Sequence, residues 1–190
     1  MSPPDNAPPA YAGMLKITGL RLLLLPLAVG FACLLAGLYG VLHNQISYSV
    51  APTYFSEFKF IQFRMPPEMQ NRLGASLIGW RASWWMGVVI GLPLWILCLL
   101  VRGTGAAIRA YLAAAIAVMA VTLTVGIVAL ILGVLTFSPD NLPAWAANRG
   151  LSDPVSFAIG GNMHNFTYLG GLIGLIAGAG VVIRHAIRAR

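Results

Sequence analysis

The chain has 190 residues, of which 58% are hydrophobic and only 9% are charged, whereas soluble domains contain roughly 25% charged residues. This composition excludes a soluble globular enzyme and a disordered protein, and it predicts an integral membrane protein. The formal net charge is +7, but no nucleic-acid-binding motif accompanies it. We therefore expect the basic residues to flank membrane spans, and we expect the lipid bilayer, not nucleic acid, to be the partner.

The first element expected along the chain is a disordered tail, residues 1–15, because four prolines fall within the first twelve positions and no periodicity is present. Four later segments are long and apolar enough to cross a bilayer, which takes about 20 residues of helix. They are residues 20–42, 82–101, 110–137 and 165–183, joined on one side by the long connections 43–81 and 138–164. The sequence thus predicts an all-α fold in which residues 16–190 form a four-helix transmembrane bundle.

The flanking charges predict the orientation of this bundle. The side with both termini and the short connection around 102–109 carries seven Lys or Arg residues and one acid, whereas the side with the long connections carries five and four. Lys and Arg accumulate on the cytoplasmic side, most strongly in short connections. We therefore expect both termini in the cytoplasm and the long connections outside, in the inner (plasma) membrane of a bacterium.

Small residues at fourfold spacing predict two packing faces. Gly170, Gly174 and Gly178 recur on the fourth span, and Ala36 and Gly40 recur on the first. Helices in lipid associate through small residues that let their backbones approach. We expect these faces to hold the bundle together.

Two histidines continue these faces toward the outer end of the bundle. His43 follows Gly40 by three positions and Ala36 by seven, and His164 precedes Gly171 by seven. Residues at such spacings lie on one side of a helix. Both imidazoles are therefore predicted to point inward at the same depth.

Glu57 completes a candidate metal site with His43 and His164. Two imidazoles and a carboxylate commonly bind zinc, iron or manganese, and copper is a further candidate. Hydrogen bonds would then orient the ligands, and the candidates for this role are Asn44, Gln45 and Asn165. Two alternatives stay open at this stage: the histidines hydrogen-bond at helix ends and cap the bundle, or they hold a single b-type haem.

The segment Tyr39-Gly40-Val41-Leu42-His43-Asn44-Gln45, with Glu57 after Tyr54-Phe55, resembles a group of uncharacterised bacterial multi-pass membrane proteins. Those proteins carry a His-Asp/Asn-Gln signature at the end of the first span and an acidic, aromatic segment after it. The resemblance covers the first third of the chain, and Asn44 stands where many members have Asp. It implies no particular activity.

Two classes of function follow from these observations. The first is a membrane protein with an outward-facing metal pocket, and the second is a structural or accessory subunit. Such a subunit would bind a partner membrane protein, or a second copy of itself, through its glycine-rich faces. No span carries an acid or a central Lys or Arg, which argues against a proton-coupled transporter. No pair of nucleophile and base and no phosphate-binding loop is visible, so the sequence identifies no reaction, and an enzymatic role stays open.

Overall fold

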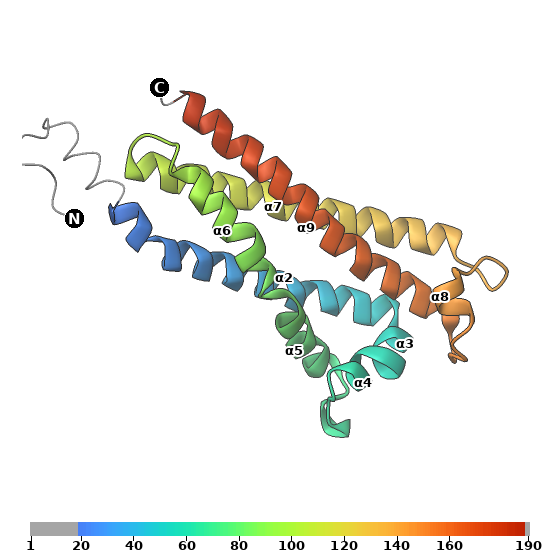
Figure 1. Ribbon diagram of the computed structural model, residues 1–190. Coiled ribbons are helices and arrows are strands. Elements are labelled where there is room, and N and C mark those ends of the chain that lie inside the picture. Colours follow the sequence, from blue (N-terminus) through green and yellow to red (C-terminus); the bar gives the residue numbers. More distant parts are fainter. Residues whose placement is uncertain (1–18, 189–190) are drawn as a thin grey trace, which may run out of the picture.

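The computed structural model describes residues 19–188, and these residues form helices joined by turns, with no strand among them. The predicted tail, residues 1–15, lies outside the described residues. The long helices are α2 (Leu25–Val50), α5 (Arg72–Ser83), α6 (Met86–Cys98), α7 (Thr104–Thr136) and α9 (Pro154–Arg188). Figure 1 shows an elongated bundle in which α7 and α9 lie side by side.

Four helical stretches of the described chain are long and apolar enough to cross a membrane, which confirms this part of the prediction. They run over Gly19–Val50, Arg72–Cys98, Thr104–Thr136 and Pro154–Arg188. Many of their large apolar side chains face outward, and Leu23, Leu135 and Ile176 are 74–76% exposed. Apolar surface of this extent is suited to contact with lipid.

Three of these stretches run further than hydropathy predicts at one end of the bundle, and at the opposite end the third stretch begins at Thr104 and not at 110. The first continues past residue 42 to Val50, the second begins at Arg72 and not at 82, and the fourth begins at Pro154 and not at 165. The hydropathy signal weakens at polar residues such as His43 and His164, but both side chains are buried inside the bundle. Mean hydropathy does not distinguish a polar residue that bonds inside the bundle from one in a loop.

Short helical pieces cover this end of the bundle. We call residues 51–71 and 137–153 the cap, and we call the opposite end, which contains Gly19 and Arg188, the terminal end (Figure 1). The two halves of the cap meet where Ser152 donates hydrogen bonds from its backbone N–H and its hydroxyl to the Glu57 carboxylate. The cap contains α3 (Pro52–Tyr54), the π-helical turn η1 (Phe55–Lys59), α4 (Phe60–Gln62), the 3-10 turn η2 (Pro67–Met69) and α8 (Ala144–Ala147).

Glycines set the close approach of the helices. A methyl group at Gly79 of α5 would collide with the backbone carbonyl of Gly40 in α2, and one at Gly87 of α6 would collide with the backbone of Cys33. The predicted glycine face of α9 lies against α7, formed by Gly170, Gly174 and Gly178. Ala36 is half-buried and lines a cavity between α2 and its neighbours.

The terminal end is held together by Arg21, whose side chain is only 4% exposed. Its guanidinium donates to the carbonyls of Leu99 (3.3 Å) and Val101 (2.7 Å), just after the end of α6, where a cation is favourable. Trp95 Nε1 donates to the Arg21 carbonyl at 3.0 Å. These bonds join the start of the first span to the end of the second.

Candidate functional site

Two buried histidines from opposite parts of the chain meet near the cap. His43 of α2 is 6% exposed and His164 of α9 is 7% exposed. Their ring centroids lie 4.6 Å apart with the ring planes at 83°, which is an edge-to-face contact. The structure brings these two candidate residues together inside the bundle.

Hydrogen bonds define the tautomer of His43. The Asn44 Nδ2 amide donates to the Ala75 carbonyl at 2.8 Å, so Asn44 Oδ1 is the atom that faces His43 Nδ1 at 3.3 Å. Since this oxygen only accepts, Nδ1 carries the proton of the neutral ring. His43 Nε2 is then unprotonated and accepts a hydrogen bond from Thr167 Oγ1, which lies 3.1 Å away.

His164 lies against an aromatic wall that belongs to the cap. Its Nε2 is 3.3 Å from Ser47 Oγ of α2. The Tyr54 and Phe55 ring centroids lie 4.8 Å and 6.0 Å from the centroid of its imidazole. Burial raises the pKa of the Tyr54 hydroxyl, so this wall stays uncharged at neutral pH.

Two glycines make room for this arrangement. A methyl group at Gly126 of α7 would lie 2.7 Å from Thr167 Oγ1 and 3.4 Å from Tyr39 Oη. A methyl group at Gly160 of α9 would lie 2.8 Å from the β-carbons of Ala51 and Tyr54. Distances of 2.7 and 2.8 Å are shorter than carbon contacts allow, so the absence of a side chain at these positions lets α7 and the cap approach α9.

Glu57, the third predicted metal ligand, lies elsewhere. It is half-buried in η1, and its carboxylate accepts hydrogen bonds from Ser152 in the other half of the cap. Among residues 19–188, no group of three or more His, Cys, Asp or Glu side chains is placed to hold a metal ion. In this structure Glu57 joins the two halves of the cap through these hydrogen bonds.

Of the three residues predicted to orient metal ligands, Asn44 contacts a histidine, as described above. Gln45 Nε2 instead donates to Arg72 O at 3.0 Å and to Ser76 Oγ at 2.8 Å, which joins α2 to α5. Asn165 is exposed on α9. The amide that matters for the site is therefore the one adjacent to His43 in sequence.

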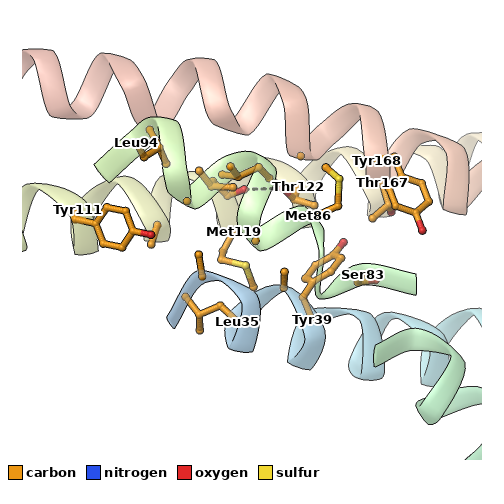
Figure 2. Close-up of a pocket in the computed structure, with 18 residues that line it drawn as sticks. Leu35, Tyr39, Ser83, Met86, Leu94, Tyr111, Met119, Thr122, Thr167 and Tyr168 are labelled. Carbon is orange, nitrogen blue, oxygen red and sulfur yellow. Dashed lines mark hydrogen bonds between the residues drawn. The ribbon is translucent and has the colours of Figure 1, made fainter. Parts of the chain in front are cut away.

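Two cavities lie near the histidine pair, and His43 lines one of them. The inner cavity, of about 80 Å³, lies between α2, α6, α7 and α9 (Figure 2). The lateral cavity, of about 780 Å³, lies between α2 and α7, and its polar lining residues are Tyr39 and His43. The two cavities share four wall residues, Leu35, Tyr39, Ala115 and Met119.

The inner cavity has hydroxyl-bearing side chains at both ends. Figure 2 shows Ser83, Thr167 and Tyr168 at one end, with Leu94 and Tyr111 at the other. Thr167 belongs to this wall and also bonds to His43, which lines the lateral cavity. The His43 imidazole thus donates a hydrogen bond to the Asn44 amide oxygen and accepts one from the Thr167 hydroxyl.

A lysine lies in the cap, among aromatic rings. The Lys59 Nζ is 5.4 Å, 5.0 Å and 5.9 Å from the ring centroids of Tyr54, Phe58 and Phe63, and it donates to Gln62 Oε1 at 3.1 Å. Burial lowers the pKa of the Lys59 amine to about 8, because the charged form loses solvation.

The sequence prediction missed three members of the site: Ser47, Tyr54 and Thr167. Ser47 follows His43 by four positions, and Thr167 follows His164 by three, so each lies on the same side of its helix as a histidine. A search for hydroxyl residues at these spacings would have found both. Tyr54 has no such signal, because it reaches His164 only through the fold of the cap.

Comparison of this chain with protein-family models, with curated proteins and with solved structures finds no match in any of the three. The geometry of the histidine pair and of the two cavities therefore carries the functional argument.

Proposed function

We propose that this chain is a multi-pass membrane protein that binds a small membrane-soluble molecule. The apolar part of the ligand would occupy the lateral cavity, and its polar head would lie against Tyr39, His43 and Thr167. The observation that carries this proposal is the cavity of about 780 Å³ whose polar lining residues are Tyr39 and His43. Ligand sites are typically concave, mostly apolar and 300–1,000 Å³ in volume, with a few polar groups that orient the ligand.

The position of the lateral cavity supports entry from the bilayer. Its wall includes Leu42 of α2 and Ile116 of α7, which are 68% and 71% exposed. These residues belong to stretches apolar enough to cross a membrane. A molecule dissolved in lipid would reach the cavity without passing through water.

Mass spectrometry of compounds that co-purify with the protein tests this proposal. Wild-type protein is expected to carry a near-equimolar small molecule. The Ala115→Phe variant, which places a ring in the wall shared by both cavities, is expected to lose it. In the matched control, Ile176→Phe, the new ring lies on the outward side of α9, where residue 176 is 74% exposed, and the compound should remain. Equal content in the two variants would count against the proposal.

A transition metal at the histidine pair is the second candidate, favoured by the ring separation of 4.6 Å. Zinc, iron or copper would need one nitrogen of each ring turned toward the ion at about 2.0–2.1 Å. Elemental analysis of wild type, His43→Gln and His164→Gln decides between the candidates. Near-stoichiometric metal that both substitutions remove would support a metal site, whereas metal-free protein with a bound organic compound would support the ligand cavity.

Two other roles lead to different expectations. A b-type haem held by both rings would keep their centroids about 6 Å apart, because an iron with two axial nitrogens stands between them. The ring centroids, 4.6 Å apart in this structure, would have to separate, and an absorption spectrum of the purified protein tests this.

A structural or accessory subunit would bind its partner through a face other than Gly170, Gly174 and Gly178, which lie against α7 of the same chain.

The charges support an inner (plasma) membrane location with the terminal end in the cytoplasm. Among the described residues, the terminal end carries cations, namely Arg21, Arg102, Arg109, Arg184 and Arg188. The cap and the adjoining turn of α5 carry basic residues and also four acids, namely Glu57, Glu68, Asp140 and Asp153. This asymmetry follows the preference of Lys and Arg for the cytoplasmic side.

A further inference from the structure

A threonine, a histidine and an asparagine form a hydrogen-bonded series beside the two cavities. Thr167 Oγ1 lies 3.1 Å from His43 Nε2, and His43 Nδ1 lies 3.3 Å from Asn44 Oδ1. The Asn44 amide is fixed in turn by its bond to the Ala75 carbonyl. A hydroxyl within about 2.6–3.2 Å of a base that a third group orients is the arrangement of an activated nucleophile. The tautomer with its proton on Nδ1 leaves His43 Nε2 able to take the Thr167 proton.

Thr167 differs in this respect from other threonines of the long helices. Thr122 and Thr124 each donate to the carbonyl four positions earlier in α7, both at 2.8 Å, which is a usual bond of a threonine inside a helix. Ser47 also pairs with an imidazole, that of His164, but Ser47 is fully buried and is not among the residues that line the two cavities. Thr167 combines an imidazole partner with a place in a cavity wall.

Thr167 lies between the two cavities. It lines the inner cavity, and its partner His43 lines the lateral cavity. Gly126 also lines the lateral cavity, and a β-carbon there would lie 2.7 Å from Thr167 Oγ1 and 3.4 Å from Tyr39 Oη. Because Gly126 has no side chain, it leaves these two hydroxyls open toward the lateral cavity. A carbonyl carbon that Thr167 attacks would therefore have one substituent in each cavity.

Two further hydroxyls are placed to stabilise the negative charge that develops on a carbonyl oxygen when Thr167 attacks. Tyr39 Oη faces the same point of the wall as Thr167, and Ser83 lies at the same end of the inner cavity (Figure 2). A hydroxyl hydrogen rotates toward an available acceptor. One donor aimed at such an oxyanion typically accelerates the reaction by about 100- to 1,000-fold.

The sizes of the two cavities and the absence of charge from their walls limit the substrate. None of the described residues that line them is Asp, Glu, Lys or Arg, so a phosphate or carboxylate group would lose its hydration without gaining a counter-charge. The inner cavity, of about 80 Å³, has room for a short acyl group only, since a cavity of about 150 Å³ holds a molecule the size of benzene. The lateral cavity, of about 780 Å³, has room for a long apolar chain.

From these observations, and resting on the function proposed above, we propose that the protein hydrolyses an uncharged ester of a short-chain acid and a long-chain alcohol. Thr167 Oγ1 forms a bond to the carbonyl carbon while its proton passes to His43 Nε2. The bond between this carbon and the alcohol oxygen then breaks, and His43 gives the proton to the leaving alcohol. Water, deprotonated by His43, releases the short acid and restores Thr167. Asn44 is a positioning residue, which holds the imidazole in the tautomer that accepts the proton.

Two isomeric esters test this proposal on the full chain in lipid nanodiscs. Hexadecyl acetate has the short acyl group and the long alcohol, and ethyl palmitate has the same composition with the lengths exchanged. Mass spectrometry measures the hexadecanol or the palmitic acid released. Wild-type protein is expected to cleave hexadecyl acetate at least about tenfold faster, because the palmitoyl chain does not fit the inner cavity. With a deuterated acetyl group, peptide mapping is expected to find the label on Thr167.

Substitutions assign the roles of the three residues. Thr167→Val removes the nucleophile and His43→Gln removes the base, and each is expected to lower cleavage at least about 100-fold, whereas Thr167→Ser should retain it. Asn44→Asp keeps an acceptor for Nδ1–H and is expected to cleave faster than Asn44→Leu. The matched control, Thr124→Val, makes the same change on the exposed side of α7, and cleavage should stay as in wild type.

The outcomes separate this proposal from the ligand cavity on which it rests. If wild-type protein cleaves neither ester, cleaves both at the same rate, or keeps its activity in Thr167→Val, the proposal is wrong, and the co-purifying compounds still test the ligand cavity. If Ala115→Phe cleaves hexadecyl acetate like wild type, the substrate does not use the lateral cavity and the proposed function itself fails. Should Thr167→Val not fold, the ratio of the two esters and the position of the acetyl label still decide.

Discussion

At the residue scale, Gly126 controls how closely α7 approaches the polar cluster. We predict that Gly126→Val lowers stability by about 1–3 kcal/mol, the usual cost of overpacking, because a β-carbon there would lie 2.7 Å from Thr167 Oγ1. The thermal unfolding midpoint in detergent measures this effect. Gly30→Val is the control, since a side chain at Gly30 meets nothing within 4 Å. Equal midpoints for the two variants would refute the packing argument.

Lys59 gives a second prediction at this scale. Only the neutral amine is a nucleophile, and burial lowers the pKa of Lys59 to about 8 from an ordinary value of 10.5. The neutral fraction therefore rises through pH 8, and acylation of Lys59 by a small reagent should reach half its maximal rate near that pH. Peptide mapping can follow Lys59 and Lys16 in one sample, as these are the chain's two lysines. A midpoint for Lys59 near pH 10 would show that its amine is not desolvated.

The same scale shows what the sequence can and cannot predict about the site. Helix periodicity is a local property, and it was enough to expect inward-facing rings at His43 and His164, which the structure places in contact. Glu57 is different, because its partner Ser152 lies 95 positions away in the chain. Neither spacing nor composition carries information about how the two halves of the cap fold together.

At the scale of secondary-structure elements, α9 offers a matched pair of glycines. A β-carbon at Gly174 would lie 3.0 Å from the Val118 carbonyl oxygen of α7, whereas one at Gly180 meets nothing within 4 Å. We predict that Gly174→Leu separates α9 from α7 and prevents folding or lowers the thermal midpoint strongly, while Gly180→Leu is tolerated. Size-exclusion chromatography and thermal unfolding of both purified variants measure this. Similar behaviour of the two would mean that α9 does not pack on α7 in this register.

Element boundaries were the least predictable part of the fold. The first span was expected to end at residue 42, yet the helix continues to Val50, because His43, Asn44 and Ser47 are buried and bonded to α5 and α9. Local hydropathy treats these residues as the start of a loop. Their burial depends on partners from distant helices, which a single-sequence pattern does not contain.

At the scale of the whole molecule, the proposed topology is testable by labelling. A cysteine at Asn148 lies in the cap, and one at Arg188 lies at the terminal end; both positions are exposed. We predict that a membrane-impermeant maleimide labels Asn148→Cys, but not Arg188→Cys, in cells whose outer membrane has been made permeable. Wild type, with Cys33 and Cys98 inside the helices, gives the background. The reverse labelling pattern would show that the protein has the opposite orientation in the membrane. Labelling at both positions would show that the cap and the terminal end lie on the same side of the membrane.

The class of fold was the easiest level to predict, because it depends on composition and segment length alone. A hydrophobic fraction of 58% and four long apolar segments were enough to expect four helices able to cross a membrane, as found. The lateral cavity was not predictable in this way. It depends on how far apart α2 and α7 lie, and this follows from the packing of both helices on their other neighbours.

The most direct test of the account is to map where a photoactivatable hexadecanol analogue, with its reactive group in the middle of the tail, attaches to the wild-type protein. The account predicts adducts on the lateral-cavity segments of α2 and α7, residues 31–46 and 112–127, and their loss in Ala115→Phe. Adducts concentrated instead on outward residues away from the cavity, such as Leu135 and Ile176, and unchanged in Ala115→Phe, would contradict it.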